Sequence, residues 1–278
     1  MSLYDIKGNV IATGGSSETS LKKVPWDTVI HRGWISGAKE NTIPALFLVK
    51  EKGYDWGECD IRFSSDGVPV LAHDATIKSE DGNTVLTVDS STVEELQSIV
   101  LQTHERFGEI KLATLKELMD VARIIDLGLV LDIKVSGTEQ NLKDLASIVV
   151  GSGFARKVIY MPTSISGAKH IQSIDKNASF DFVSNPNTAT DFTQYQELLT
   201  GSNTVAFDMQ ASTTDANGGV DMEVVNAIHS AGLNVSFWNI RTSSYLSYMD
   251  AGPIRITKQN TADAVDLDSA YLNTKTLW

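Results

Sequence analysis

The chain has little cysteine, little proline, no long hydrophobic run and too few basic residues to balance its acidic ones. Its one cysteine, Cys59, excludes an internal disulfide and any metal site built from several cysteines. The longest apolar runs, such as the one around Leu127 to Val130, are far shorter than the ~20 residues of a membrane helix, so we expect no integral membrane segment. No basic segment followed by an apolar run opens the chain, so we expect no signal peptide in it and either a cytoplasmic or a secreted location.

The charge balance narrows the choice of partners. The formal net charge is −12, from 35 acidic and 23 basic residues, and this disfavours a nucleic acid or an anionic membrane as partner because both would be repelled at long range. This net charge is still compatible with a small phosphate ester that binds in a locally basic pocket. Apolar residues make up 42% of the chain, which is enough for one sizeable core.

The hydrophobic pattern predicts alternating strands and helices. Residues 1–24 contain a possible hairpin around Lys7-Gly8-Asn9 and a Gly/Ser-rich stretch, so we interpret them as an extension or linker and residues 25–278 as one domain. Within that domain we expect eight strands, at 28–31, 57–61, 129–133, 157–161, 179–183, 204–208, 234–238 and 253–257.

Helical patterns fill most of the gaps between these strands, for example at 41–52, 114–125 and 222–230. Strands that alternate with helices pair in parallel, and eight such units close into a (β/α)₈ TIM barrel. A doubly wound open sheet is the alternative that periodicity alone leaves open.

One interval departs from the alternation. Asp66-Gly67 stands between two alternating runs and indicates a hairpin, so we expect the second strand to pass the barrel rim, fold back and deliver His73 there. Residues 75–112 then look like a small, irregular cap insertion with a turn at Asp81-Gly82-Asn83.

Acidic residues stand on two of the predicted strands. Glu58 and Asp60 point to the same face because side chains alternate along a strand, while Cys59 points to the opposite face. Two carboxylates turned into a barrel mouth would repel each other unless a cation lay between them, and a hard divalent ion bonds such oxygens. Asp132 and Lys134 repeat the same spacing on the next barrel strand.

Each of these features also has an ordinary structural explanation. An acidic pair is often a solvated face, a strand-end lysine such as Lys134 is often a surface charge, and a lone histidine is more often structural than catalytic. We keep that structural interpretation for His104, His170 and His229. A functional site is favoured by a set of residues that all fall at predicted strand ends on one rim: His31, Glu58, Asp60, His73 and Asp132.

These residues carry a resemblance to the glycerophosphodiester phosphodiesterase family. The matching motifs are His31-Arg32-Gly33, Glu40-Asn41-Thr42 six residues later, Glu58-x-Asp60, Asp66-Gly67 and His73-Asp74. Residues 113–118, the LDIK segment at 131–134 and the segment around Trp238 resemble later family motifs less specifically. The resemblance spans roughly residues 26 to 257.

The resemblance implies a role for each candidate residue. Glu58, Asp60 and Asp132 would hold one Mg²⁺ or Ca²⁺, with Glu40 close to the ion or the substrate. Arg32 and Lys134 would contact the phosphate, and Trp238 would form an apolar wall for the glycerol carbons. His31 and His73 would be the general base and acid, in an order that the sequence leaves open.

The chain also departs from the family pattern. Lys39 stands where the family usually has proline, Asp132 replaces a glutamate, and Asn239-Ile240-Arg241 differs after the tryptophan. No aspartate follows Thr257. Three functions stay open: an enzyme that hydrolyses small glycerophosphodiesters to glycerol 3-phosphate and an alcohol, a phosphodiesterase that acts on a glycerol-phosphate cell-wall polymer, and an inactive barrel that serves as a binding module.

Overall fold

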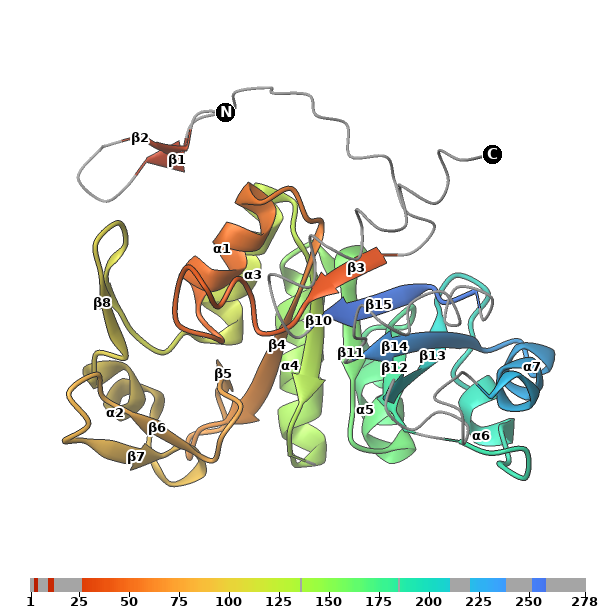
Figure 1. Ribbon diagram of the computed structural model, residues 1–278. Helices are drawn as coiled ribbons and strands as arrows, with labels where there is room; N and C mark the ends of the chain where they lie inside the picture. Colours follow the sequence, from red (N-terminus) through yellow and green to blue (C-terminus); the bar gives the residue numbers. More distant parts are fainter. Residues whose placement is uncertain are drawn as a thin grey trace, which may run out of the picture.

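A closed ring of parallel strands forms the centre of the protein (Figure 1). The computed structural model describes residues 27–135, 137–184, 186–210, 221–238 and 252–258, together with two short strands near the amino terminus. Within these ranges the ring consists of β3 (Asp27–Ile30), β4 (Trp56–Phe63), β10 (Gly128–Ile133), β11 (Val158–Met161), β12 (Ser179–Val183), β13 (Val205–Gln210), β14 (Asn234–Trp238) and β15 (Arg255–Lys258). Because β15 pairs with β3, and β4 pairs with both β3 and β10, the sheet has no open edge at this point and the (β/α)₈ barrel prediction is confirmed.

Helices follow most of the barrel strands. They are α1 (Ile43–Glu51), α3 (Leu115–Ile125), α4 (Glu139–Gly151), α5 (Ile165–Ile174), α6 (Thr193–Gln196) and α7 (Met222–Ser230), with a 3₁₀ turn η2 (Ala155–Lys157). Side-chain oxygens fix their starts: Thr114 and Thr138 form complete capping boxes, in which the cap hydroxyl and the third helical residue satisfy each other's backbone. Throughout the described ranges, every helix is too short or too polar to cross a membrane.

The alternation of side chains along each strand decides which residues reach the barrel interior. Cys59 and Ile61 of β4 pack outward, in the same hydrophobic core as Leu129 and Leu131 of β10 and the surrounding helices. Their neighbours in the chain therefore point inward. A second apolar cluster fills part of the barrel interior, and it consists of Val29, Val130, Ile159, Met161 and the partly buried Trp56.

A hairpin carries β4 beyond the barrel. β5 (Pro69–Leu71) returns antiparallel to it, with Ile61 opposite Leu71, and the turn closes with a Gly67 N–H to Ser64 C=O hydrogen bond of 2.9 Å. Gly67 has φ of +80°, a conformation that favours glycine. The hairpin returns the chain to the rim two residues before His73, as predicted.

The cap insertion is more regular than expected. It contains β6 (Thr76–Lys78), β7 (Val85–Thr87), η1 (Val88–Ser90), α2 (Val93–Ser98), β8 (Gln102–His104) and β9 (Gly108–Ile110). The prediction of an irregular segment was therefore wrong: two short hairpins and a capped helix share a small core of their own. Its strands have three residues each, too few for periodicity to be recognised. Figure 1 shows the cap elements β6, β7, α2 and β8 gathered on one side of the molecule.

The expected amino-terminal hairpin is also present. β1 (Leu3–Tyr4) and β2 (Val10–Ala12) pair antiparallel on either side of Lys7-Gly8-Asn9. The rest of residues 1–24 and the segment Asn239-Ile240-Arg241 lie outside the described residues.

Candidate active site

The loop after β3 is held by backbone geometry that brings Arg32 over β4. Arg32 and Gly33 both have positive φ, +56° and +82°. The Arg32 N–H donates to Glu58 Oε2 over 2.7 Å, which ties the loop to the second barrel strand. Gly33 packs directly on the start of α1, where a Cβ atom would lie 2.8 Å from the Ala45 carbonyl carbon. Glycine is therefore needed here for its conformation and for its lack of a side chain.

The next motif, Glu40-Asn41-Thr42, bonds three different parts of the structure. The Glu40 carboxylate lies 3.3 Å from the Arg32 guanidinium. Asn41 holds Asp60 twice, because its Nδ2 donates to Asp60 Oδ2 over 2.7 Å and its Oδ1 accepts from the Asp60 N–H over 2.8 Å. Thr42 caps α1 by accepting from Ala45 N–H.

Three carboxylates meet where β4 and β10 run side by side. Asp60 and Asp132 are direct neighbours in the parallel register, and Glu58 precedes Asp60 on the same inward face. One oxygen from each of these side chains lies within 4.8 Å of the others. The Lys134 ammonium lies 2.5 Å from Asp132 Oδ2 and 2.9 Å from Asp60 Oδ1. The predicted carboxylate set is thus brought together.

The electrostatics of this cluster favour an additional cation. Burial raises the pKa of Glu58 well above its usual value, and the neighbouring charges of Asp60 and Asp132 raise it further. Burial also raises the pKa of Asp132, although the Lys134 ammonium opposes this. Within the described part of the chain, the buried Glu58 Oε1 has no hydrogen-bond partner. An orphaned oxygen beside two more carboxylates is the donor set that Mg²⁺ and Ca²⁺ prefer, so these residues fit a hard divalent ion.

The two predicted histidines occupy the same rim in different settings. His31 Nε2 lies 3.9 Å from Glu58 Oε2. Burial, with a smaller effect of the Arg32 charge, lowers the pKa of His31 to about 4, so its imidazole is uncharged near neutral pH. His73 Nδ1 lies 2.8 Å from Asp74 Oδ1, and the bond to His73 lowers the pKa of Asp74. Since an ionised Asp74 only accepts, His73 Nδ1 carries the proton and Nε2 is its other ring nitrogen.

Two predicted residues are not part of the carboxylate cluster. Glu40 is not one of the three clustered acids; its carboxylate contacts Arg32 instead. Trp238 is the last residue of β14, opposite Gln210 of β13 and Thr257 of β15, and so lies at the carboxyl end of its strand. Its indole Nε1 is buried and has no hydrogen-bond partner among the described residues.

The sequence interpretation missed several residues at or near this site. Asn41 was noted only as part of a motif, although it orients Asp60. Arg62 has the same strand parity as Glu58 and Asp60, which was a usable signal, and its Nε donates to the His73 carbonyl over 2.7 Å. Arg106 N–H and the Gly37 carbonyl bond the two ring nitrogens of His104, so the structural interpretation of that histidine is supported.

A second buried polar group stands on the barrel strands β12, β13 and β15. The Arg255 guanidinium binds both carboxylate oxygens of Asp181, with both side chains buried. Asp208 is also buried, and burial together with the Asp181 charge raises its pKa well above the usual value. Because each of these residues stands alone in an apolar run, no pattern in the sequence marked them.

With this geometry in place, the comparisons with known proteins identify the family. Residues 31–255 match the sequence profile of the glycerophosphoryl diester phosphodiesterase family, and the chain belongs to that family. Glycerophosphodiester phosphodiesterase 1 of Mus musculus is 33% identical over 111 residues. That match covers 38% of this chain and only 33% of the mouse protein, so it spans about a third of the relative's length.

Solved structures agree on the fold over most of the chain. A glycerophosphodiester phosphodiesterase from Parabacteroides distasonis aligns with a TM-score of 0.69 at 19% identity, covering 90% of this chain and 99% of that one. A phosphodiesterase from Oleispira antarctica, solved with the product sn-glycerol-3-phosphate, aligns with a TM-score of 0.68 at 20% identity, covering 86% and 96%. At these identities the likeness supports the barrel fold.

Proposed function

We propose that this protein hydrolyses glycerophosphodiesters to glycerol 3-phosphate and an alcohol, with one divalent ion, Mg²⁺ or Ca²⁺. The observation that carries the proposal is the convergence of Glu58, Asp60 and Asp132 within 4.8 Å beside His31 and Arg32. Family membership supports the same reaction class. We assign the activity to residues 25–278 and regard residues 1–24 as an extension or linker.

The three carboxylates would hold the ion. When bound, such an ion withdraws negative charge from the non-bridging phosphate oxygens. Arg32 and Lys134 are the fixed cations beside the same carboxylates, and they would bind the phosphate and orient it. Glu40 holds the Arg32 side chain from its other side at 3.3 Å, which favours one orientation of the guanidinium.

Hydrolysis also requires two proton transfers. One proton leaves the attacking oxygen, and one reaches the oxygen of the departing alcohol. We assign these transfers to His31 and His73, in either order. An uncharged His31 is able to accept a proton, and His73 presents Nε2 while Asp74 holds Nδ1 at 2.8 Å. Trp238 would border the glycerol carbons from the β14 side of the rim.

Product analysis tests this proposal. Purified protein is incubated with glycerophosphocholine and glycerophosphoethanolamine, with and without EDTA, and glycerol 3-phosphate is measured. We expect release that EDTA abolishes and that added Mg²⁺ or Ca²⁺ restores. Glu58→Ala should lose both turnover and bound metal because two carboxylates hold an ion less tightly than three.

Three results would contradict the assignment. Wild-type turnover and metal content in Glu58→Ala would remove the carboxylate cluster from the mechanism. Breakdown of a glycerol-phosphate polymer without turnover of either small diester would favour the polymer-degrading function, and phosphodiester binding without any hydrolysis would favour a binding module.

A further inference from the structure

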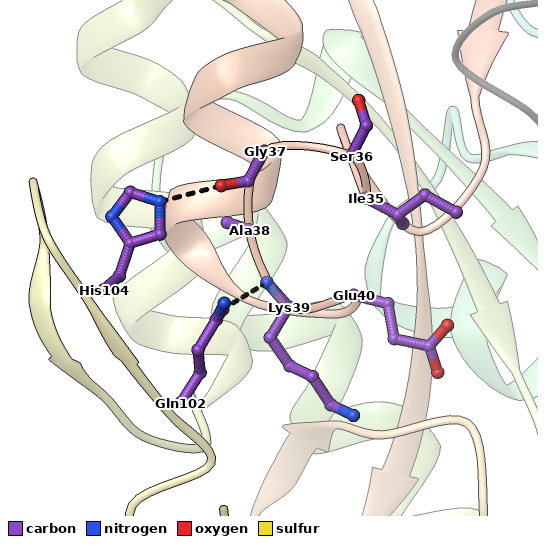
Figure 2. Close-up of a pocket in the computed structure, with 8 residues that line it drawn as sticks. All are labelled: Ile35, Ser36, Gly37, Ala38, Lys39, Glu40, Gln102 and His104. Atoms are coloured by element: carbon purple, nitrogen blue, oxygen red, sulfur yellow. Dashed lines mark hydrogen bonds between the residues drawn. The ribbon is translucent and has the colours of Figure 1, made fainter.

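A cavity of about 440 Å³ lies beside the catalytic loop (Figure 2). Residues 35–40 of the β3–α1 loop form one wall, and Gln102 and His104 of the cap strand β8 form the other. Its volume lies in the usual range for pockets that hold small ligands. Of its lining residues, only Glu40 has a role in the function proposed above.

Hydrogen bonds fix both walls of this cavity. The Lys39 N–H donates to Gln102 Oε1 over 2.7 Å, and His104 Nε2 donates to the Gly37 carbonyl over 2.8 Å. His104 Nδ1 accepts from the Arg106 N–H over 3.0 Å, so the ring donates on one side, accepts on the other and carries no charge. The cap therefore holds the loop in place, and the cavity is an open hollow between these two tethered segments.

The cavity adjoins the partner of Arg32, the residue that we propose binds the phosphate. Glu40 lines it and also contacts the Arg32 guanidinium at 3.3 Å. Arg32 Nε in turn lies 3.2 Å from Asp60 Oδ2 in the carboxylate cluster. A diester has two arms on its phosphate, so a phosphate held at Arg32 is able to place one arm along Glu40 into this cavity.

The positive charge at the cavity comes from Lys39. Glu40 shares the Arg32 guanidinium with Asp60, and His104 is uncharged, whereas the exposed Lys39 ammonium has no carboxylate within ion-pair distance among the described residues. Figure 2 shows the Lys39 and Glu40 side chains both extending away from Gly37. The chain has a net charge of −12, and an unpaired lysine beside the catalytic loop therefore gives this cavity a local preference for anions.

We propose that this cavity binds the alcohol half of the diester, and that Lys39 selects alcohols that carry a further phosphate over cationic alcohols such as choline. This inference rests on the proposed hydrolase function and specifies its substrate class. Lysine suits the task because its ammonium is a compact point charge on a flexible stem, which binds phosphate without a fixed geometry.

The test compares three diesters that differ in the charge of the alcohol: glycerophosphoglycerol, the same compound with a terminal phosphate, and glycerophosphocholine. For wild type we expect the highest kcat/KM on the phosphorylated diester. Lys39→Ala should lower the ratio of kcat/KM between the phosphorylated and the choline diester about five- to tenfold, and Lys39→Glu should invert it. Raising the salt concentration should shrink the wild-type preference because the lysine is exposed.

Two further variants make the comparison specific. Lys39→Arg should keep the preference because it keeps the charge. Lys116→Ala removes the same charge from the exposed face of α3, outside the cavity, and should leave the ratio unchanged. An unchanged ratio in Lys39→Ala, with all three diesters hydrolysed, would overturn the role of Lys39 while leaving the hydrolase function intact. Absence of hydrolysis of any diester would overturn both.

Discussion

The two hydrogen bonds between Asn41 and Asp60 give the most quantitative prediction. Asn41→Ala removes a buried hydrogen bond to a carboxylate, which contributes about 1.5–3 kcal/mol, and leaves the buried Asp60 N–H without its acceptor, which costs about 1–3 kcal/mol. Asn41 also has φ of +54°, where alanine is less favourable than asparagine by about 1–2 kcal/mol. Since such terms are not additive, we expect a loss of about 3–5 kcal/mol in the free energy of unfolding.

Function should fall with stability, because Asp60 would lose the group that orients it. Removing a group that orients a metal ligand typically lowers metal affinity by about 10–100-fold. Urea unfolding measures the stability, and calorimetric titration with Mg²⁺ or Ca²⁺ measures the affinity. Asn41→Gly separates the two causes, since glycine tolerates the backbone angle and should regain about 1–2 kcal/mol of stability while metal affinity stays low.

A matched control is available in the cap. Asn83 Nδ2 bonds Asp81 over 2.8 Å in an exposed turn, so Asn83→Ala removes the same kind of contact at the surface. It should cost less than about 1 kcal/mol and leave metal affinity unchanged. The reasoning fails if Asn41→Ala unfolds no more readily than Asn83→Ala and binds metal as tightly as wild type.

Three further outcomes are expected. Burial raises the pKa of Asp208, so the folded state holds this proton more tightly than the unfolded state, and stability falls as pH rises above the unfolded pKa of about 4. The variant Asp208→Asn should therefore match or exceed the wild-type Tm at pH 7. A variant that is destabilised more at pH 7 than at pH 4, relative to wild type, would contradict this. Gly33→Ala should lower the free energy of unfolding by about 2–4 kcal/mol, because of the positive φ and the 2.8 Å approach to Ala45. Gly153→Ala, at φ +72° in open space, should show the backbone cost alone. Equal losses for the two variants in urea unfolding would refute the packing argument. Mg²⁺ or Ca²⁺ at 100 times its Kd should stabilise the wild type by about 2.7 kcal/mol, and a thermal shift of the same size in Glu58→Gln would place the ion elsewhere.

The barrel and one side of its rim were predictable because they follow from periodicity. All eight predicted strands are present, and the alternation along β4 correctly separates Glu58 and Asp60 from Cys59. Parallel strands also bring their carboxyl ends to one rim, so the positions of His31 and Asp132 at predicted strand ends were enough to group them, and the hairpin signal at Asp66-Gly67 added His73.

The remainder depends on contacts that no local pattern specifies. The partner of Glu40 is an arginine eight residues earlier, at a position with positive φ that the hydrophobic pattern does not signal. The buried pair between Asp181 and Arg255 joins residues 74 positions apart, and each looks like an isolated charge in an apolar strand. Side-chain pairing at such separations is a property of the closed barrel rather than of its segments.

The pairing of β3 with β15 has a consequence for the order of events during synthesis. Arg255 lies opposite Asp27, so the strand that leads into His31 finds its second neighbour only more than two hundred residues later in the chain. A nascent chain that has emerged as far as Lys134 already contains every carboxylate of the proposed metal site, both histidines and Arg32, yet one edge of β3 is still unpaired. Long-range closure of this kind is slow, and an exposed strand edge is prone to wrong partners. We therefore expect the proposed activity to appear in a single late step, when the last barrel strand leaves the ribosome and docks.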